Sequence, residues 1–165
     1  IFSHEPDTRY TYSGEGIHYL QRVVEHITGM SLDQLAQREV FTPFGMTNTS
    51  YKWLDEYDKT AVYGYNALNV RGSQGTKAEN AAYSMRTNVR DFSKFLDALM
   101  SGYGLKRETF HEMTAPHRII EPGSYFGLGV RVQPNLDTNC GPMWYHSGSN
   151  TNFRCMFWMF PQQGS

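Results

Sequence analysis

The stretch MWYHSGSNTNFRCMFWMF, residues 143–160, decides the fold class of this chain. Met143 to His146 predicts a strand, and Phe153 to Phe160 predicts a second strand that is apolar almost throughout. A run of that kind is typical of a strand that is buried on both faces. Residues 147–152 read Ser-Gly-Ser-Asn-Thr-Asn, which predicts a turn between the two strands.

One more strand is expected upstream of this stretch, in Phe126 to Val132. Apolar residues occupy every second position there, namely Leu128, Val130 and Val132, and the residues between them are Gly127, Gly129 and Arg131. A period of two is the pattern of a half-buried strand. The last third of the chain is therefore predicted to form a sheet.

Before the sheet, the apolar spacing indicates helices. Four helices are predicted, from Gly16 to Gly29, from Ser31 to Pro43, from Thr87 or Asn88 to Gly102, and from Arg107 to Met113. The first helix has one apolar stripe that is expected to be buried, made of Ile17, Leu20, Val23, Val24 and Ile27. Helices first and strands last predict an α+β fold.

Residues 51–84 follow neither the helical nor the strand period. Gly, Asn, Lys and Tyr are common in them, so a long irregular stretch is expected. A loop of that length in a compact domain is usually functional, for example as a lobe over a cleft.

Length and charge exclude several classes of protein. The chain has 165 residues and a net charge of −1, which fits one domain and argues against a nucleic-acid binder. An aromatic share of 15% with so low a net charge argues against disorder. The longest purely apolar run, Cys155 to Phe160, is too short to span a membrane.

Cysteine and histidine residues indicate neither a metal site nor a cofactor. Cys140, Cys155 and the six histidines show no zinc-binding spacing. His111 and Glu112 begin like a zinc-binding helix motif, but Pro116 breaks the helical face that would have to reach His117. Two free thiols are the simpler interpretation of the cysteines, and a disulfide between them stays open.

Two residues could carry acid–base chemistry. Tyr12 lies directly before the first predicted helix, and His146 ends a strand where it could face a cleft. After His146, Gly148 would let a ligand approach the backbone, and the N–H of Ser149 could point at an oxyanion. Taken alone, Tyr12 is more often a packed aromatic residue and His146 more often a structural one, so both interpretations stay open.

A nucleophile is not apparent from the sequence. Ser13 and Ser147 do not lie in a Gly-x-Ser-x-Gly elbow. No serine of the chain has a lysine three positions later, so there is no Ser-x-x-Lys motif in residues 1–165.

Six segments along the chain form an ordered set. They are PDTRYTYS (6–13), the first predicted helix with MSL (30–32), VFTPFGMTNT (40–49), MRT with DF (85–87 and 91–92), YFGLG (125–129) and HSGSN (146–150). This set resembles the serine β-lactamase and penicillin-binding-protein-like family, in its class C β-lactamase, D,D-carboxypeptidase and esterase branch. The resemblance covers nearly the whole chain.

The resemblance implies a β-lactamase/transpeptidase-like fold and an acyl-serine mechanism. A serine of Ser-x-x-Lys would attack a carbonyl, Tyr12 would be the general acid/base, and His146 would stand in place of the lysine of the third motif. Gly148, Ser149 and Asn150 would border the substrate, and the N–H of Ser149 would serve the oxyanion hole. The partner would be a small-molecule or peptide-like acyl substrate, with no cofactor, and the location periplasmic or extracellular. The oligomeric state stays open.

Two departures from the family pattern bear on the substrate. Gly14 stands where the family's Tyr-x-Asn motif has asparagine, so the amide that would hold the acyl-amide group of a β-lactam is absent. His146 replaces lysine, which weakens the capture of a carboxylate at neutral pH. Both changes favour an esterase or a D,D-peptidase over a true β-lactamase.

The absent Ser-x-x-Lys motif predicts that residues 1–165 are an internal part of a longer domain of this family. Strands before Ile1 and a strand and helix after Ser165 are then expected, and the chain alone is expected to be inactive. The edge of the strand Phe153 to Phe160 would be unprotected, so aggregation is expected. The alternative is a non-catalytic relative that only binds acyl ligands.

Overall fold

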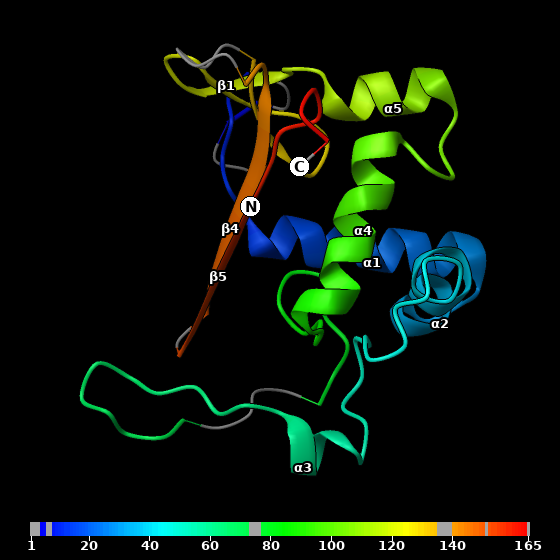
Figure 1. Ribbon diagram of the computed structural model, residues 1–165, viewed down its shortest axis with the longest axis vertical. Coiled ribbons are helices and arrows are strands. Elements are labelled where there is room, and N and C mark those ends of the chain that lie inside the picture. The colour runs from blue at the N-terminus through cyan, green and yellow to red at the C-terminus, as the bar shows by residue number, and fades with distance from the viewer. Residues whose placement is uncertain (1–3, 6–7, 73–76, 135–139, 151, 165) are drawn as a thin grey trace. The chain divides into compact units, whose positions relative to one another are not determined.

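The computed structural model describes residues 4–5, 8–72, 77–134, 140–150 and 152–164 (Figure 1). The helical elements come first: α1 (Gly14–Thr28), α2 (Leu32–Ala36), the π-helical segment η1 (Gln37–Phe41), α3 (Tyr57–Thr60), α4 (Val89–Ser101) and α5 (Arg107–Thr114). The strands follow: β1 (Arg118–Glu121), β2 (Ser124–Phe126), β3 (Arg131–Gln133), β4 (Met143–Asn150) and β5 (Phe153–Met159). The predicted α+β fold is confirmed.

The chain divides into two compact units. The first unit consists of Ile1–Tyr12, Ala98–Gly148 and Arg154–Ser165, and the second of Ser13–Asp97 and Ser149–Phe153. The sheet has the strand order β1-β2-β3-β4-β5, and the pairs β1–β2, β2–β3 and β3–β4 are antiparallel.

The single strand predicted from Phe126 to Val132 is wrong. β2 ends at Phe126 and β3 begins at Arg131, and the two strands pair as a hairpin. The turn between them is closed by a 2.8 Å hydrogen bond from Gly127 N to Val130 O. Gly129 lies in that turn with φ 97°, a conformation that favours glycine. Apolar residues that alternate with Gly127 and Gly129 gave the period of two that is typical of a strand, although the chain turns there.

The strands β4 and β5 also differ from their prediction. β4 continues through Asn150, so residues 147–150, which were predicted as a turn, are part of the strand. Burial of β5 on both faces was the wrong expectation, because Met156 is 61% exposed and Trp158 is 53% exposed. β5 is the last strand in the order of the described sheet. The apolar sequence of β5 therefore did not show that other residues cover its faces.

Helix α1 begins two residues before the predicted start, because Ser13 caps it. The Ser13 Oγ accepts the N–H of Gly16 at 3.0 Å, and Gly29 ends the helix with φ 66°, as predicted. The predicted apolar stripe is largely exposed, including Leu20 and Ile27. The buried residue of α1 is instead Gln21, at 4% exposure.

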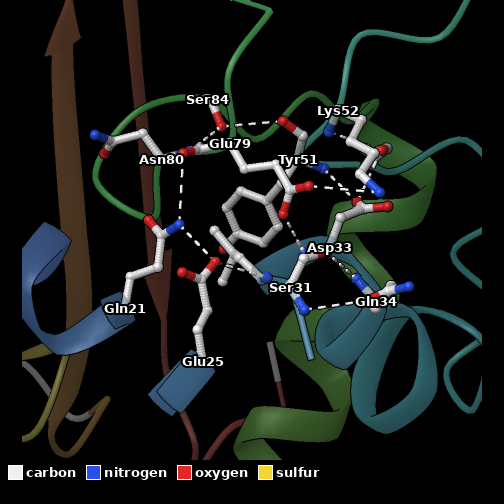
Figure 2. A network of polar contacts seen from close by, with 12 residues as sticks. Gln21, Glu25, Ser31, Asp33, Gln34, Tyr51, Lys52, Glu79, Asn80 and Ser84 are labelled. Carbon is white, nitrogen blue, oxygen red and sulfur yellow. Dashed lines mark hydrogen bonds and ion pairs between the residues drawn. The ribbon is translucent and has the colours of Figure 1, made fainter. Parts of the chain in front are cut away.

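A polar network holds the second unit together (Figure 2). The Gln21 side chain donates to Glu25 Oε1 and accepts the N–H of Ala81, both at 2.9 Å. Glu79 accepts the N–H of Asp33 at 2.8 Å, and its other carboxylate oxygen lies 3.4 Å from Lys52 Nζ. A side chain of α1 therefore satisfies a backbone N–H of the irregular stretch 51–84, and a side chain of that stretch satisfies a backbone N–H of α2.

Asp33 extends this network from α2. Its Oδ1 accepts from Ser50 Oγ at 2.8 Å and from Tyr51 N at 2.7 Å. Ser31 and Gln34 form the predicted capping box at the start of α2. The described part of the stretch 51–84 is irregular, as predicted, apart from the short α3 and one isolated bridge between Tyr65 and Arg71.

Asp91 ties the start of α4 to the segment that follows η1. This side chain is buried, and its Oδ2 accepts from Asn48 N at 2.6 Å and from Thr49 Oγ1 at 3.1 Å. Asn88 accepts the N–H of Asp91 at 2.9 Å, which confirms one of the two expected helix caps. Gly102 follows α4 with φ 65°, where the helix was predicted to end.

Candidate functional site

The first unit brings the two predicted acid–base residues together. The rings of Tyr12 and His146 have centroids 6.2 Å apart and are tilted by 36°. Tyr12 directly precedes Ser13, the cap of α1, and is 62% exposed. His146 is half-buried in the middle of β4. An exposed hydroxyl beside a half-buried imidazole can exchange protons with a bound molecule.

One aromatic residue of the first unit, Phe126, contacts His146, and a second, Tyr10, contacts Phe126. Phe126, at the end of β2, meets the His146 ring edge to face, with centroids 5.9 Å apart. Tyr10 stacks on Phe126 with centroids 4.9 Å apart. Ser124 Oγ and the Tyr145 hydroxyl lie 2.9 Å apart, which joins β2 to β4. The contact with Phe126 restricts the orientation of the imidazole.

Arg131 adds a positive charge to this cluster. It pairs with Tyr145 across β3 and β4, and its guanidinium carbon lies 5.8 Å from the centroid of the Tyr145 ring and 5.9 Å from that of Phe126. Its Nε and the Tyr10 hydroxyl are buried without a hydrogen-bond partner among the described residues. Sequence reasoning did not single out either residue, although an arginine within an otherwise apolar and glycine-rich run was the available signal.

The surroundings favour the neutral imidazole. Burial lowers the pKa of His146 below its usual value of about 6.5, and the charge of Arg131 lowers it further. A hydrogen bond with the backbone of Ser147 opposes both effects. The pKa of Tyr10 is raised by its burial, which outweighs the opposing charge of Arg131. The lowered pKa of His146 favours its neutral form at neutral pH.

The other predicted site residues follow His146 on β4. A Cβ at Gly148 would lie 3.0 Å from the sulfur of Cys155, so glycine allows β5 to approach closely. Ser149 and Asn150 are exposed at the end of the strand. The first unit ends on β4 at Gly148, and Ser149 and Asn150 belong to the second unit.

The described residues contain no group of three or more metal-binding side chains. Cys140 and Cys155 are both free. No described helix combines the length and the apolar character needed to cross a bilayer.

Comparison with known proteins identifies the family. The model of the beta-lactamase family matches residues 2–165. The fold is similar to that of a beta-lactamase/D-alanine carboxypeptidase from Pseudomonas syringae, with a TM-score of 0.83 and 15% identity over 98% of this chain and 54% of that one. It is also similar to an octameric penicillin-binding protein homologue from Pyrococcus abyssi, with a TM-score of 0.84 and 20% identity over 98% of this chain and 38% of that one.

A third solved structure extends this range of relatives. A D-stereospecific amidohydrolase from Streptomyces sp. has a TM-score of 0.78 and 20% identity over 98% of this chain and 49% of that one. The chain thus spans about half the length of the solved structures it matches, or less. Identities this low establish a shared fold, whereas the match of the family model covers nearly every residue. The chain belongs to the beta-lactamase family.

Proposed function

We propose that this chain is part of a serine hydrolase that opens an ester, amide or lactam bond through an acyl-serine intermediate. The observation that carries the proposal is the contact between Tyr12 and His146, with ring centroids 6.2 Å apart. Membership of the beta-lactamase family supports the reaction class. Because residues 1–165 contain no Ser-x-x-Lys motif, the attacking serine of this proposal lies outside them.

In the proposed reaction the serine oxygen attacks the carbonyl carbon. The Tyr12 hydroxyl accepts the serine proton while it donates its own proton to the leaving group, so the tyrosine is neutral before and after the bond breaks. The oxyanion of the tetrahedral intermediate accepts a hydrogen bond from the N–H of Ser149. Water then attacks the acyl-serine, with Tyr12 as the base, and releases the acid. The neutral His146 orients the Tyr12 hydroxyl or the substrate.

The uncharged state of His146 supports the proposed substrate class. With its pKa lowered by burial and by Arg131, His146 is neutral at pH 7 and attracts a carboxylate less than the lysine of related sites would. Gly14 offers no side-chain amide to the substrate. An esterase or D,D-peptidase activity is therefore favoured over β-lactam hydrolysis.

A second candidate is a penicillin-binding-protein-like domain that binds acyl ligands without turnover. The absent Ser-x-x-Lys motif favours it. The coding sequence upstream of Ile1 separates the two candidates. A Ser-x-x-Lys motif there supports the hydrolase, and its absence supports the binding domain.

Kinetics on the longest chain that the gene encodes test the roles of the residues. The substrates are a p-nitrophenyl ester and a chromogenic lactam, and the variants are Tyr12→Phe and His146→Gln. Loss of an acid/base group is expected to lower kcat about 10²–10⁴-fold for Tyr12→Phe. The matched control is Tyr19→Phe, an exposed tyrosine of α1, which is expected to keep full turnover. Unchanged turnover in Tyr12→Phe would contradict the proposal.

A further inference from the structure

A small hairpin in the second unit packs on Asn152 and Phe153, where β5 begins. Residues 64–72 form this hairpin, and residues 149–153 belong to the same unit. Gly72 N donates to Gly64 O at 2.8 Å, and Asn66 N donates to Val70 O at 3.1 Å. The Asn66 side chain accepts two further backbone N–H groups of the tip, each at 2.9 Å. The hairpin is therefore held in shape by its own hydrogen bonds.

Gly64 at the base of the hairpin has no room for a side chain. A Cβ there would lie 2.6 Å from the Cβ of Asn152, 2.7 Å from the Asn152 carbonyl oxygen and 2.8 Å from the Phe153 ring. All three distances are far inside van der Waals contact, and one of the atoms belongs to the backbone. The glycine is required here because of close approach and not because of φ.

Gly72 stands opposite Gly64 and meets the same residue. A Cβ at Gly72 would overlap the side-chain amide nitrogen of Asn152 and would lie 2.8 Å from its Cγ. The atoms it meets belong to a side chain that can rotate away. The two glycines thus let the hairpin enclose Asn152, one against its backbone and the other against its amide.

The enclosed residue lies next to the proposed oxyanion donor. Asn152 lies between Asn150, the last residue of β4, and Phe153, the first residue of β5. Ser149 is three positions upstream of Asn152 in the sequence. We propose that the hairpin 64–72 is a positioning element that fixes Asn152 and thereby the end of β4 that carries Ser149. This inference rests on the proposed function, because it gives the Ser149 N–H its fixed direction.

A rigid support of this kind has a chemical purpose. An oxyanion donor stabilises a transition state only if it is held in place before the charge develops. The last residues of a strand next to a turn are otherwise free to move. In the proposal, close packing of the hydrogen-bonded hairpin on Asn152 reduces that freedom.

Two glycine variants test the proposal by NMR of backbone amides in the full chain. Gly64→Ala pushes on the backbone of Asn152, so the amide signals of Ser149 and Asn150 are expected to shift or broaden. Gly72→Ala pushes only on the amide side chain, so a smaller shift is expected. Removing that side chain with Asn152→Ala in the Gly72→Ala background is expected to bring the Ser149 signal to its position in Asn152→Ala alone.

The matched control is Gly16→Ala, where the added Cβ meets only Ser13 at 3.5 Å, an ordinary contact. It is expected to leave the Ser149 signal in place. The proposal is overturned if Gly64→Ala moves hairpin signals while Ser149 and Asn150 stay unchanged. If Gly64→Ala does not fold, the Gly72→Ala and Asn152→Ala pair decides. The measurement follows an amide signal and does not need hydrolase activity. It therefore tests the positioning role even if the chain proves to be inactive.

Discussion

At the scale of single residues, burial and the charge of Arg131 both lower the pKa of His146. The structure joins Arg131 and His146 through a cluster that also contains Phe126 and Tyr145. Both effects disfavour the imidazolium, so the positive charge of this cluster lies on Arg131 and not on His146. The local sequence identified His146 as a candidate acid–base residue. It could not show that Arg131, which is distant in the sequence, places a positive charge near the imidazole.

Arg131→Met is predicted to raise the pKa of His146, because one of the two causes that lower it is removed. The measurement is an NMR titration of the His146 ring proton. Arg107→Met, which removes an exposed arginine of α5, is the control and is expected to leave that titration unchanged. A His146 pKa that stays the same or falls in Arg131→Met would contradict the assigned cause.

The same group makes folding depend on pH. The folded pKa of His146 lies below the unfolded value of about 6.5, so the unfolded chain takes up the proton more readily. The contribution of His146 to folding stability is therefore fully present above the pKa of the unfolded chain. It decreases as the pH falls below that value, and it is lost completely below the pKa of the folded chain.

Asp91→Asn is predicted to destabilise the chain by about 2 kcal/mol, because a charged acceptor of buried hydrogen bonds is lost. Its hydrogen bonds and the nearby Lys94 outweigh the effect of burial and lower the pKa of Asp91. The stability it provides is present above the unfolded pKa and disappears as the pH falls through the folded pKa. Urea unfolding at several pH values measures this effect. An equal loss in the exposed control, Asp55→Asn, would contradict it.

At the scale of elements, the caps were the most predictable features. The Ser31 and Gln34 capping box and the glycines that end α1 and α4 were predicted and are present. Local backbone groups fix such features, so a short sequence window contains the necessary information. The β2–β3 turn was missed because period-two glycines do not distinguish a strand from a tight turn.

Ser31→Ala is predicted to cost about 1 kcal/mol of folding stability, because the first turn of α2 loses its side-chain acceptor. Thermal or urea unfolding measures the loss. Ser93→Ala, on the exposed surface of α4, is the matched control with a much smaller expected cost. Equal costs in the two variants would show that the capping box contributes nothing of its own.

At the scale of the whole molecule, burial could not be predicted from apolar pattern. The stripe of α1 and the apolar run of β5 were both expected to be covered, yet Leu20, Ile27, Met156 and Trp158 are exposed. Periodicity shows which face is apolar and does not show what lies against it. The expectation that residues 1–165 form part of one longer domain stays a prediction.

Exposed apolar side chains on an edge strand predict self-association. Trp158→Lys places a charge on β5 and is expected to reduce aggregation at high protein concentration, as followed by light scattering. Val62→Lys, at another exposed apolar residue, is the matched control and is expected to have little effect. If both variants reduce scattering equally, the added positive charge explains the effect, and self-association through the edge of β5 is contradicted.

The acyl-serine is the intermediate on which the whole proposal depends, and peptide mapping by mass spectrometry tests it most directly. The longest chain that the gene encodes is mixed with a p-nitrophenyl ester and quenched during turnover. We predict one acyl group, on the serine of a Ser-x-x-Lys motif outside residues 1–165. An acyl group on a serine within these residues, such as Ser13 or Ser147, or turnover without any acylated serine, would contradict the proposed mechanism.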